Sequence, residues 1–395
     1  MSAPSESQID SPQGWLVVGA TFLSTFTVFG VAYSFAPFFA PMADEFGGQR
    51  SEVALFFAIT TFLYFGLGVV TGRVSDRIGP RRVLLLGAVA MVIGLLATSR
   101  VQNLWTGYLT YGLGVGIGVA CAYVPMVATV GLWFERRRSA AMGVAVAGIG
   151  VGTLVAAPTA EALIDRYGWR DTYVVLAVAT GVLLAIAAIG AKRPDGVGGP
   201  ADVRPLREVI TGSRSFAIMY FSALVLVLAL FVPFVFIGDY MEVENVDGSV
   251  GLVLAVIGSS SVIGRLGLGA LAARWVPIRL YQGSFLIVGL SFLIWLAAGA
   301  AYPMLILFAV VFGVAYGGFI ALAPAVAADL FGPVGLGGVL GAIYTAAGVG
   351  GLIGPPLAGE LIDAIGYSAS LLVCCGFGVA AFAVLLPLRV SAAAH

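Results

Sequence analysis

Charged residues are scarce in this chain of 395 residues: only 10% are Asp, Glu, Lys or Arg, whereas 60% are hydrophobic and the mean hydropathy is +1.04. A soluble globular protein has about 25% charged residues, so this composition indicates a protein embedded in a lipid bilayer. The 20 basic and 20 acidic residues give a net charge of zero, which argues against a nucleic-acid partner.

Histidine and cysteine are almost absent as well. The only histidine is His395, and the three cysteines, Cys121, Cys374 and Cys375, lie in apolar runs without a C-x-x-C pair. This excludes histidine-based catalysis and leaves no framework for disulfides or a metal site. Intramembrane hydrolysis would need a Ser–His pair, two deep aspartates or a metal cluster. We therefore expect no enzymatic activity, no metal and no cofactor.

The polar segment 1–13, MSAPSESQIDSPQ, contains no Lys or Arg. It lacks the basic start of a secretory signal, and no small-residue cleavage pattern follows the first apolar run. We expect an N-terminal tail over residues 1–13 and a first helix that is kept in the mature protein.

Twelve apolar runs are present, and a membrane-spanning helix takes about 20 residues. The runs do not alternate polar and apolar residues, as the strands of a barrel would. The sequence therefore predicts an all-α membrane protein with twelve transmembrane helices. Their approximate ranges are 14–40, 53–72, 83–99, 103–133, 139–160, 172–190, 216–238, 249–272, 278–299, 303–330, 334–360 and 367–388.

Basic residues between these runs are unevenly distributed. With both termini in the cytoplasm, 15 of the 20 fall in inward loops and Arg265 falls within a span; the outward loops hold only Arg50, Arg100, Arg166 and Arg170. Cytoplasmic loops of membrane proteins are enriched in Lys and Arg. We therefore expect a multi-pass protein of the plasma (inner) membrane with both termini cytoplasmic.

The chain also contains an internal repeat. GRVSDRIGPRR from Gly72 and GALAARWVPIR from Gly269 share Gly, Arg, Pro and Arg positions at an offset of 197 residues, and the Pro, LID and Gly positions of 158–168 recur in 356–366 at an offset of 198. A period of half the chain indicates a duplicated unit. Two parallel repeats around a central cavity are typical of transporters.

The segment 191–215 is the only long polar connection between spans. Because it is rich in Pro and Gly, it reads as a cytoplasmic linker. We expect a six-helix bundle over 14–190, a second over 216–390 and a C-terminal tail over 391–395.

The loop that begins at Gly72 resembles the signature loop of the major facilitator superfamily. Its matching positions are Gly72, Asp76, Arg77, Gly79, Arg81 and Arg82. The resemblance implies the major facilitator fold, with two pseudo-symmetric six-helix bundles and a gate on the cytoplasmic side. There, Asp76 would face a helix N-terminus of the other half, which favours an anion, and the arginines would pair with nearby acids.

Three further stretches are similar to the monocarboxylate transporter family. They are YSFAPFFAPMADEFGGQRSEVALFFAI from Tyr33, WFERRRSAAMGVAVAGIGVG from Trp133 and GLIGPPLAGELID from Gly351. The bacterial branch, with its oxalate/formate-exchanger relatives, is the most similar. In this family an arginine of the eighth span binds the substrate carboxylate, and Arg265 falls in that span.

Arg265 has no charged neighbour in the sequence between Asp247 and Arg274. An unpaired charge near the bilayer centre costs about 3 kcal/mol on insertion scales, and none of the acids lies deep in a predicted span. In one interpretation the side chain reaches the interface near Arg274, about 13 Å away along the helix. In the other, the anion arrives with the substrate, because a guanidinium offers a planar fork matched to a carboxylate.

Polar groups on the apolar spans complete the predicted site. Ser261 lies one turn from Arg265 on the same helix face, and buried tyrosines offer hydroxyls together with apolar rings. The predicted substrate-binding residues are Arg265, Tyr33, Tyr344, Tyr123, Tyr316 and Ser261.

Animal members of the monocarboxylate transporter family, which this chain resembles, carry Asp at the position of Ser261 and Lys at that of Tyr33. Without those ionisable groups, a proton carried on the substrate, anion exchange and passive uniport all remain open.

We therefore predict a secondary transporter that moves a small organic monocarboxylate, similar to lactate or pyruvate, by alternating access. The expected partners are the small organic anion, protons in the case of symport, and the lipid bilayer, with the protein acting as a monomer. The alternative is a major facilitator carrier or efflux pump for neutral or lipophilic small molecules. It shares the fold and differs only in the cavity.

Overall fold

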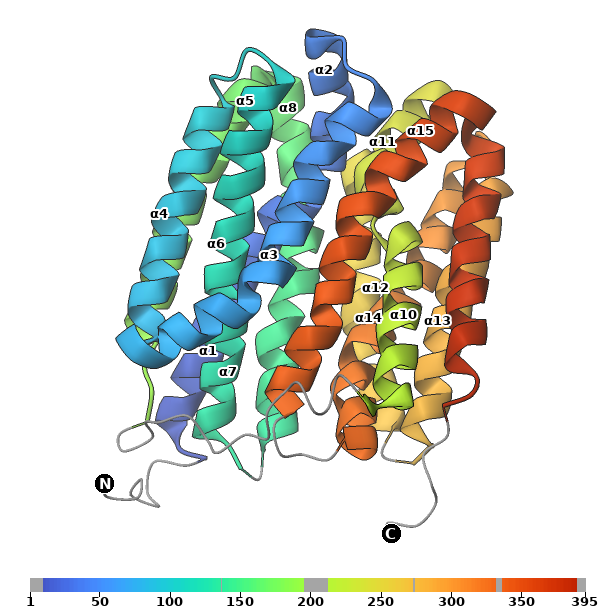
Figure 1. Ribbon diagram of the computed structural model, residues 1–395. Helices are drawn as coiled ribbons and strands as arrows, with labels where there is room; N and C mark the ends of the chain where they lie inside the picture. Colours follow the sequence, from blue (N-terminus) through green and yellow to red (C-terminus); the bar gives the residue numbers. More distant parts are fainter. Residues whose placement is uncertain (1–9, 136, 195–211, 273, 332–335, 389–395) are drawn as a thin grey trace.

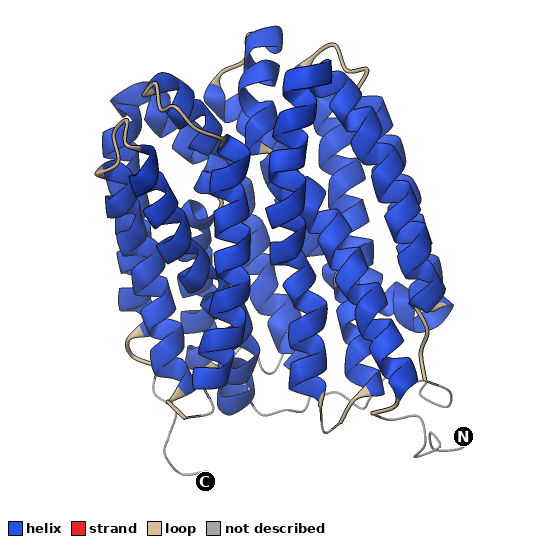
Figure 2. Cartoon of the chain, turned by 180° about the vertical axis from the view of Figure 1, so that it is seen from behind, coloured by secondary structure: helices blue, strands red, loops and turns tan. Residues whose placement is uncertain are grey.

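The computed structural model describes residues 10–135, 137–194, 212–272, 274–331 and 336–388. Within these residues every regular element is a helix (Figure 2), so the all-α class predicted from the sequence is confirmed for them. Ten helical segments are long and apolar enough to cross a membrane. The predicted linker and the two predicted tails lie largely outside the described residues.

The helices follow one another with short connections. Those of the first half are α1 (Pro12–Tyr33), α2 (Ala36–Phe46), α3 (Arg50–Ile78), α4 (Pro80–Thr98), α5 (Leu104–Gly107), the π-helical segment η1 (Tyr108–Leu113), α6 (Gly114–Ala122), α7 (Val124–Trp133) and α8 (Arg138–Gly190). Those of the second half are α10 (Arg214–Leu230), α11 (Val232–Val243), α12 (Val250–Leu271), α13 (Pro277–Leu296), α14 (Tyr302–Phe331) and α15 (Leu336–Leu385).

The two longest segments, α8 and α15, are each broken by one glycine. Gly168 has φ 79° and ψ 163°, and Gly366 has φ 79° and ψ 171°. A side chain would make this backbone conformation costly, so glycine is the residue that permits the reversal. These are the glycines that recur at an offset of 198 in the sequence, so the repeat marks two equivalent bends.

The two halves of the chain lie on opposite sides of the molecule in Figure 1, with the blue-to-green helices on the left and the yellow-to-red helices on the right. We call the end where α1 begins and α15 ends the terminal end. The opposite end, with α2 and the bends of α8 and α15, is the distal end (top of Figure 1).

Two helix pairs make most of the contact between the halves: α3 packs against α15, and α8 packs against α12. A smaller contact joins α2 and α11. We call the two larger contacts the central seam. A Cβ added to Gly258 would lie 2.6 Å from the carbonyl oxygen of Gly150, and one added to Gly351 would lie 2.2 Å from the Thr61 methyl carbon. Small residues allow this close approach, so each contact depends on a glycine at the crossing.

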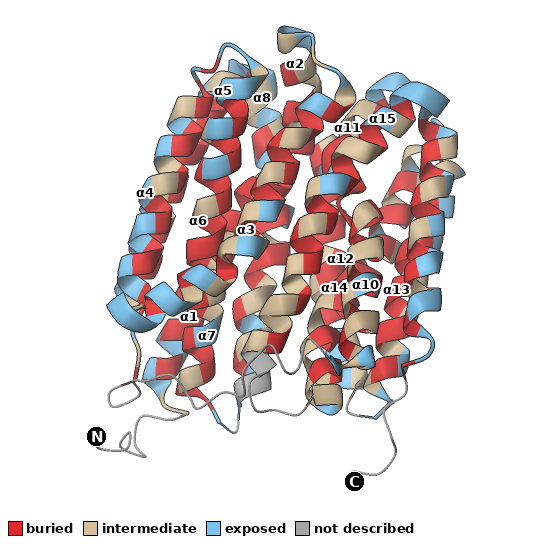
Figure 3. Cartoon of the chain, viewed as in Figure 1, coloured by how far each residue is buried: buried red, intermediate tan, exposed pale blue. Residues whose placement is uncertain are grey.

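Exposed residues lie along the outer faces of the helices (Figure 3), and many of them are large and apolar. On α4, for example, Leu86, Val89 and Ile93 are exposed, and their spacing of three and four residues puts them on one helix face. In a protein that spans a membrane, such a face lies against lipid. The buried faces of the helices point inward and form the core.

Candidate functional site

Three helices are interrupted near the middle of the molecule. The breaks follow Tyr33 between α1 and α2, occur at Tyr123 between α6 and α7, and occur at Phe231 between α10 and α11. Each new helix has a proline in its first turn. A proline cannot donate a backbone hydrogen bond and clashes with the preceding turn, so it favours a new helix start. These prolines are Pro37, Pro125 and Pro233.

The residues at the breaks line a small central cavity of about 40 Å³. Helices of both halves contribute to its wall, which is made almost entirely of aromatic and aliphatic side chains. The lining residues are Phe29, Tyr33, Phe65, Tyr123, Ile149, Val227, Leu230, Phe231, Tyr316, Phe319, Ile320, Tyr344 and Ala347. All four tyrosines predicted from the sequence are therefore brought together here.

Arg265 of α12 lies beside this cavity. Its side chain is 6% exposed, and it is the only Lys, Arg, Asp or Glu among the described residues that is buried. Its Nη1 donates to the carbonyl oxygen of Val146 in α8 at 2.7 Å. Its guanidinium carbon lies 5.9 Å from the ring centre of Tyr316, within cation–π range. The side chain is thus held inside the molecule and does not reach an interface.

The remaining donors of Arg265 are free. Neither Nε nor Nη2 has a hydrogen-bond partner among the described residues, although both atoms are buried. These two nitrogens share one edge of the guanidinium, and two parallel N–H donors match the oxygens of a carboxylate. Since an unsatisfied buried donor costs roughly 1–3 kcal/mol, this edge is a strong candidate for binding an anion.

A row of tyrosine hydroxyls crosses from one half to the other beside the cavity. Tyr316 of α14 donates to the hydroxyl of Tyr33 at 3.1 Å, and the Tyr33 and Tyr64 hydroxyls are 3.4 Å apart. Tyr64 was missed by the sequence analysis. It is fully buried in α3, and the criterion used for the other four, a tyrosine within an apolar span, would have found it.

Ser261 is buried one turn before Arg265, but its hydroxyl donates to the carbonyl oxygen of Gly258 at 2.7 Å. It therefore does not contact the guanidinium. The described residues contain no group of three or more His, Cys, Asp or Glu that could hold a metal ion. What the site offers is one buried cation, several hydroxyls and an apolar wall.

The predicted cytoplasmic gate lies at the terminal end, where α3 meets α4. Asp76 accepts from Nη2 of Arg193 at 2.7 Å, and Arg193 follows α8 in the same half of the chain. The contact that the resemblance implied, with a helix N-terminus of the other half, is not formed among the described residues.

The other gate positions lie around the turn between α3 and α4. Gly79 ends α3 with φ 90°, and Gly72 lies about two turns before that end. Arg77, Arg81 and Arg82 are exposed, and none of the three forms an ion pair with a described residue.

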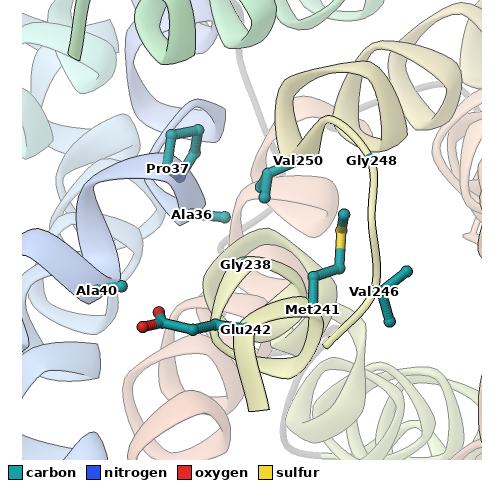
Figure 4. A pocket seen from close by; sticks show the side chains of 9 residues that line it. All are labelled: Ala36, Pro37, Ala40, Gly238, Met241, Glu242, Val246, Gly248 and Val250. Carbon is teal, nitrogen blue, oxygen red and sulfur yellow. The ribbon is translucent and has the colours of Figure 1, made fainter. Parts of the chain in front are cut away.

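A second cavity, of about 230 Å³, opens at the distal end between α2 and the start of α12 (Figure 4). Glu242 is the charged residue in its wall, which also includes Ala36, Pro37, Ala40, Gly238, Met241, Val246, Gly248 and Val250. None of the predicted site residues lines it. At this cavity, residues of the two halves face each other and leave space between them.

The chain matches known transporters over most of its length. The Major Facilitator Superfamily profile matches residues 21–301 and 278–395. Monocarboxylate transporter 3 of Rattus norvegicus is 32% identical over 374 residues, which cover 90% of this chain and 75% of the relative. Monocarboxylate transporter 11 of Mus musculus is 32% identical over 388 residues, covering 93% and 86%. Monocarboxylate transporter 13 of Rattus norvegicus is 30% identical over 389 residues, covering 96% and 90%.

A similar fold occurs in a solved structure. The bacterial homologue of the human lysosomal transporter Spinster, in an inward-facing and unoccupied conformation, aligns with a TM-score of 0.75 over 95% of this chain and 96% of its own. The sequence identity is 14%, so this likeness concerns the fold alone. Together with the ten apolar helices, these matches identify a multi-pass membrane transporter rather than an enzyme.

Proposed function

Because the chain belongs to the monocarboxylate transporter family of the major facilitator superfamily, we propose that it carries a small organic monocarboxylate, similar to lactate or pyruvate, across the membrane. The observation that supports this most directly is the buried guanidinium of Arg265 with Nε and Nη2 unpartnered. A substrate carboxylate would occupy that edge. The relatives carry the term monocarboxylate in their names.

The charge of the site favours a single carboxylate. Desolvating a cation is costly unless an opposite charge compensates it, and no described acid pairs with Arg265. One bound carboxylate neutralises it, whereas a second would have no buried cation to meet among the described residues. The aromatic wall suits a compact apolar body attached to the carboxylate.

Arg265 is not itself one of the lining residues of the central cavity; Tyr316 is its neighbour in the wall. The Tyr316 ring lies both in the cavity wall and against the guanidinium. We therefore propose that Tyr316 moves when the substrate binds. Tyr33, Tyr123 and Tyr344 would surround the rest of the molecule with rings and hydroxyls.

Alternating access would use the central seam. Counting α8 and α15 as two helices each turns the ten apolar segments into twelve spans. We propose two six-helix bundles, over 14–190 and 216–390, that rock about the seam. The distribution of basic residues supports a cytoplasmic terminal end, so that the distal end would face outward, and the loop with Gly72, Asp76 and Gly79 would belong to the inner gate.

Among the described residues, Arg265 is the only buried Lys, Arg, Asp or Glu, which limits how transport could be coupled to a proton. Ser261 and Tyr33 occupy the positions where ionisable side chains would assist proton movement. Proton symport would then carry the proton on the substrate, and anion exchange would need none. Accumulation driven by a pH gradient in liposomes supports the first, and uptake that requires internal substrate supports the second.

The test of the carboxylate site is an uptake assay with purified protein in liposomes. Arg265→Gln should lower monocarboxylate uptake at least tenfold, because a charge-assisted bidentate contact is worth roughly 1.5–3 kcal/mol. Arg265→Lys should rescue it only in part, since an ammonium lacks the planar fork. Arg274→Gln, at an exposed arginine beyond the end of the same helix, is the matched control.

Normal uptake by correctly inserted Arg265→Gln protein would contradict the proposed site. The apolar wall of the cavity gives the alternative, transport of neutral or lipophilic molecules, its own support. That alternative expects Arg265→Gln to retain transport of such compounds, so the same variant separates the two functions.

A further inference from the structure

Two glutamates occupy nearly equivalent places at the distal end. Glu161 lies three residues after Pro158 in α8, and Glu360 lies four residues after Pro356 in α15. Each side chain reaches across the central seam to the first turn of a helix in the other half. The two contacts therefore mirror the internal repeat: one glutamate reaches from the first half to the second, and the other reaches from the second half to the first.

Glu161 binds the N-terminus of α12. Its Oε1 accepts from the backbone N–H of Val250 at 2.8 Å, and its Oε2 accepts from the N–H of Gly251 at 3.0 Å and from the hydroxyl of Ser249. Ser249 is the N-cap residue of α12. One carboxylate thus satisfies two backbone donors that a helix start leaves without intrahelical partners.

Glu360 makes the corresponding contact at the start of α3. Its Oε1 accepts from the hydroxyl of Ser51 at 2.6 Å. A glycine permits the close approach in each case: a Cβ on Gly251 would lie 2.5 Å from Cα of Pro158, and one on Gly359 would lie 2.6 Å from the Ser51 nitrogen. Both glutamates lie at the positive end of a helix dipole.

Arg50 adds a third contact across the seam. Its Nε lies 2.7 Å from Asp239 in α11, and its Nη1 lies 2.7 Å from Asp363 in α15. Tyr367 also donates to Asp239. The Tyr367 bond lies within the second half, whereas the bonds of Glu161, Glu360 and Arg50 all join opposite halves at one end. These cross-half bonds are made together when that end is closed and are lost together when it opens.

We propose that Glu161, Glu360 and Arg50 form a distal latch that holds the distal end closed and sets the balance between the two access states. Opening this end would take from the start of α12 the carboxylate that accepts the N–H groups of Val250 and Gly251, and from the start of α3 the carboxylate that accepts the Ser51 hydroxyl. This role concerns the conformational equilibrium and does not depend on which substrate is carried.

The latch can be tested by measuring the opening of the distal end directly. Spin labels at Asp44→Cys in α2 and Asp247→Cys before α12 occupy exposed positions in opposite halves, and the three native cysteines are buried. Pulsed electron–electron double resonance measures the distance between the two spin labels. The distance distribution would give the proportions of closed and open forms without added substrate.

Glu161→Ala should raise the ratio of open to closed form roughly tenfold, because it removes the acceptor of two backbone N–H groups at the start of α12. Glu360→Ala should raise it about two- to tenfold, because it removes one hydroxyl bond. The double variant should shift it further. Asp165→Ala removes an exposed carboxylate one turn along α8 and should leave the ratio unchanged, as a matched control for α8.

Glu161→Gln and Glu360→Gln keep an oxygen acceptor and should give a smaller shift in the same direction. These variants also serve if the alanine variants cannot be purified. A distance distribution that stays at the wild-type proportions in all the glutamate variants obtained would overturn the proposal. So would an equal shift in the Asp165→Ala control.

Discussion

Among the described residues, ion pairs that join the two halves occur at the distal end and not at the terminal end. At the distal end, Arg50 links its own helix to Asp239 and Asp363 of the other half. At the terminal end, Arg193 pairs with Asp76 of the same half. The first arrangement resists separation of the halves, whereas the second stabilises one half by itself. The structure therefore represents a state in which the two halves are held together at the distal end.

The exposure of the charges strengthens this contrast. The Asp239 side chain is 13% exposed, and that of Asp76 is 76% exposed. An exposed ion pair contributes about 0–1 kcal/mol, while removing one partner of a pair that is largely buried leaves a poorly solvated charge. The distal contacts should consequently dominate the equilibrium between the two ends.

The central seam is the part of the molecule that both ends share. A substitution in the seam should therefore have the largest effect on stability. Gly258→Leu places a side chain against the backbone of Gly150, so we expect a loss of stability of about 3 kcal/mol from overpacking. Thermal unfolding followed by intrinsic fluorescence measures it. Gly267→Leu on the same helix has open space around it and should change the unfolding temperature little. Equal shifts in both variants would contradict the proposed role of the crossing.

Removing one arginine from each end tests the contrast directly. Arg50→Ala should lower the free energy of unfolding by about 1–2 kcal/mol, because Asp239 loses a charged partner in a largely buried place. Arg193→Ala should change it by less than about 1 kcal/mol. Thermal unfolding in one detergent measures both variants. A larger loss for Arg193→Ala would reverse the ranking of the two ends.

The smallest effect is expected between the two ends, at the hydroxyl bond of Tyr316 with Tyr33. Tyr316→Phe keeps the ring beside Arg265 and removes one neutral hydrogen bond, worth about 0.5–1.5 kcal/mol. We expect a change in kcat/KM for uptake of roughly two- to tenfold. Tyr123→Phe alters the same cavity without touching that bond. Identical changes in the two variants would argue that only the cavity wall matters.

Much of this architecture could be predicted from local patterns. Apolar runs of sufficient length predicted the helices, and the recurrence of Gly168 at Gly366 indicated a duplicated unit. The structure adds that both glycines permit a bend, because they have positive φ. Arg265 was identified as a candidate binding residue because an unpaired charge in an apolar run is costly and must be explained physically. These features are encoded in neighbouring residues, so the sequence alone exposes them.

Long-range pairings could not be read in the same way. The sequence showed that no acid lies deep in a predicted span, but nothing local indicates that Arg50 meets an acid 313 residues away. Asp76 shows the converse, since family resemblance implied a contact across the halves and the structure has one within a half. Such partners depend on which helices pack together and on how far each end is closed.

The bond between Arg265 and the carbonyl oxygen of Val146 has a consequence for how this binding site can change. A main-chain oxygen is present whatever residue occupies position 146, so no replacement of that side chain removes the acceptor itself. The rings and aliphatic groups of the wall are side chains and can be exchanged one at a time. Substitutions in the wall can therefore alter the space around the proposed substrate body while the backbone bond that positions Arg265 is kept.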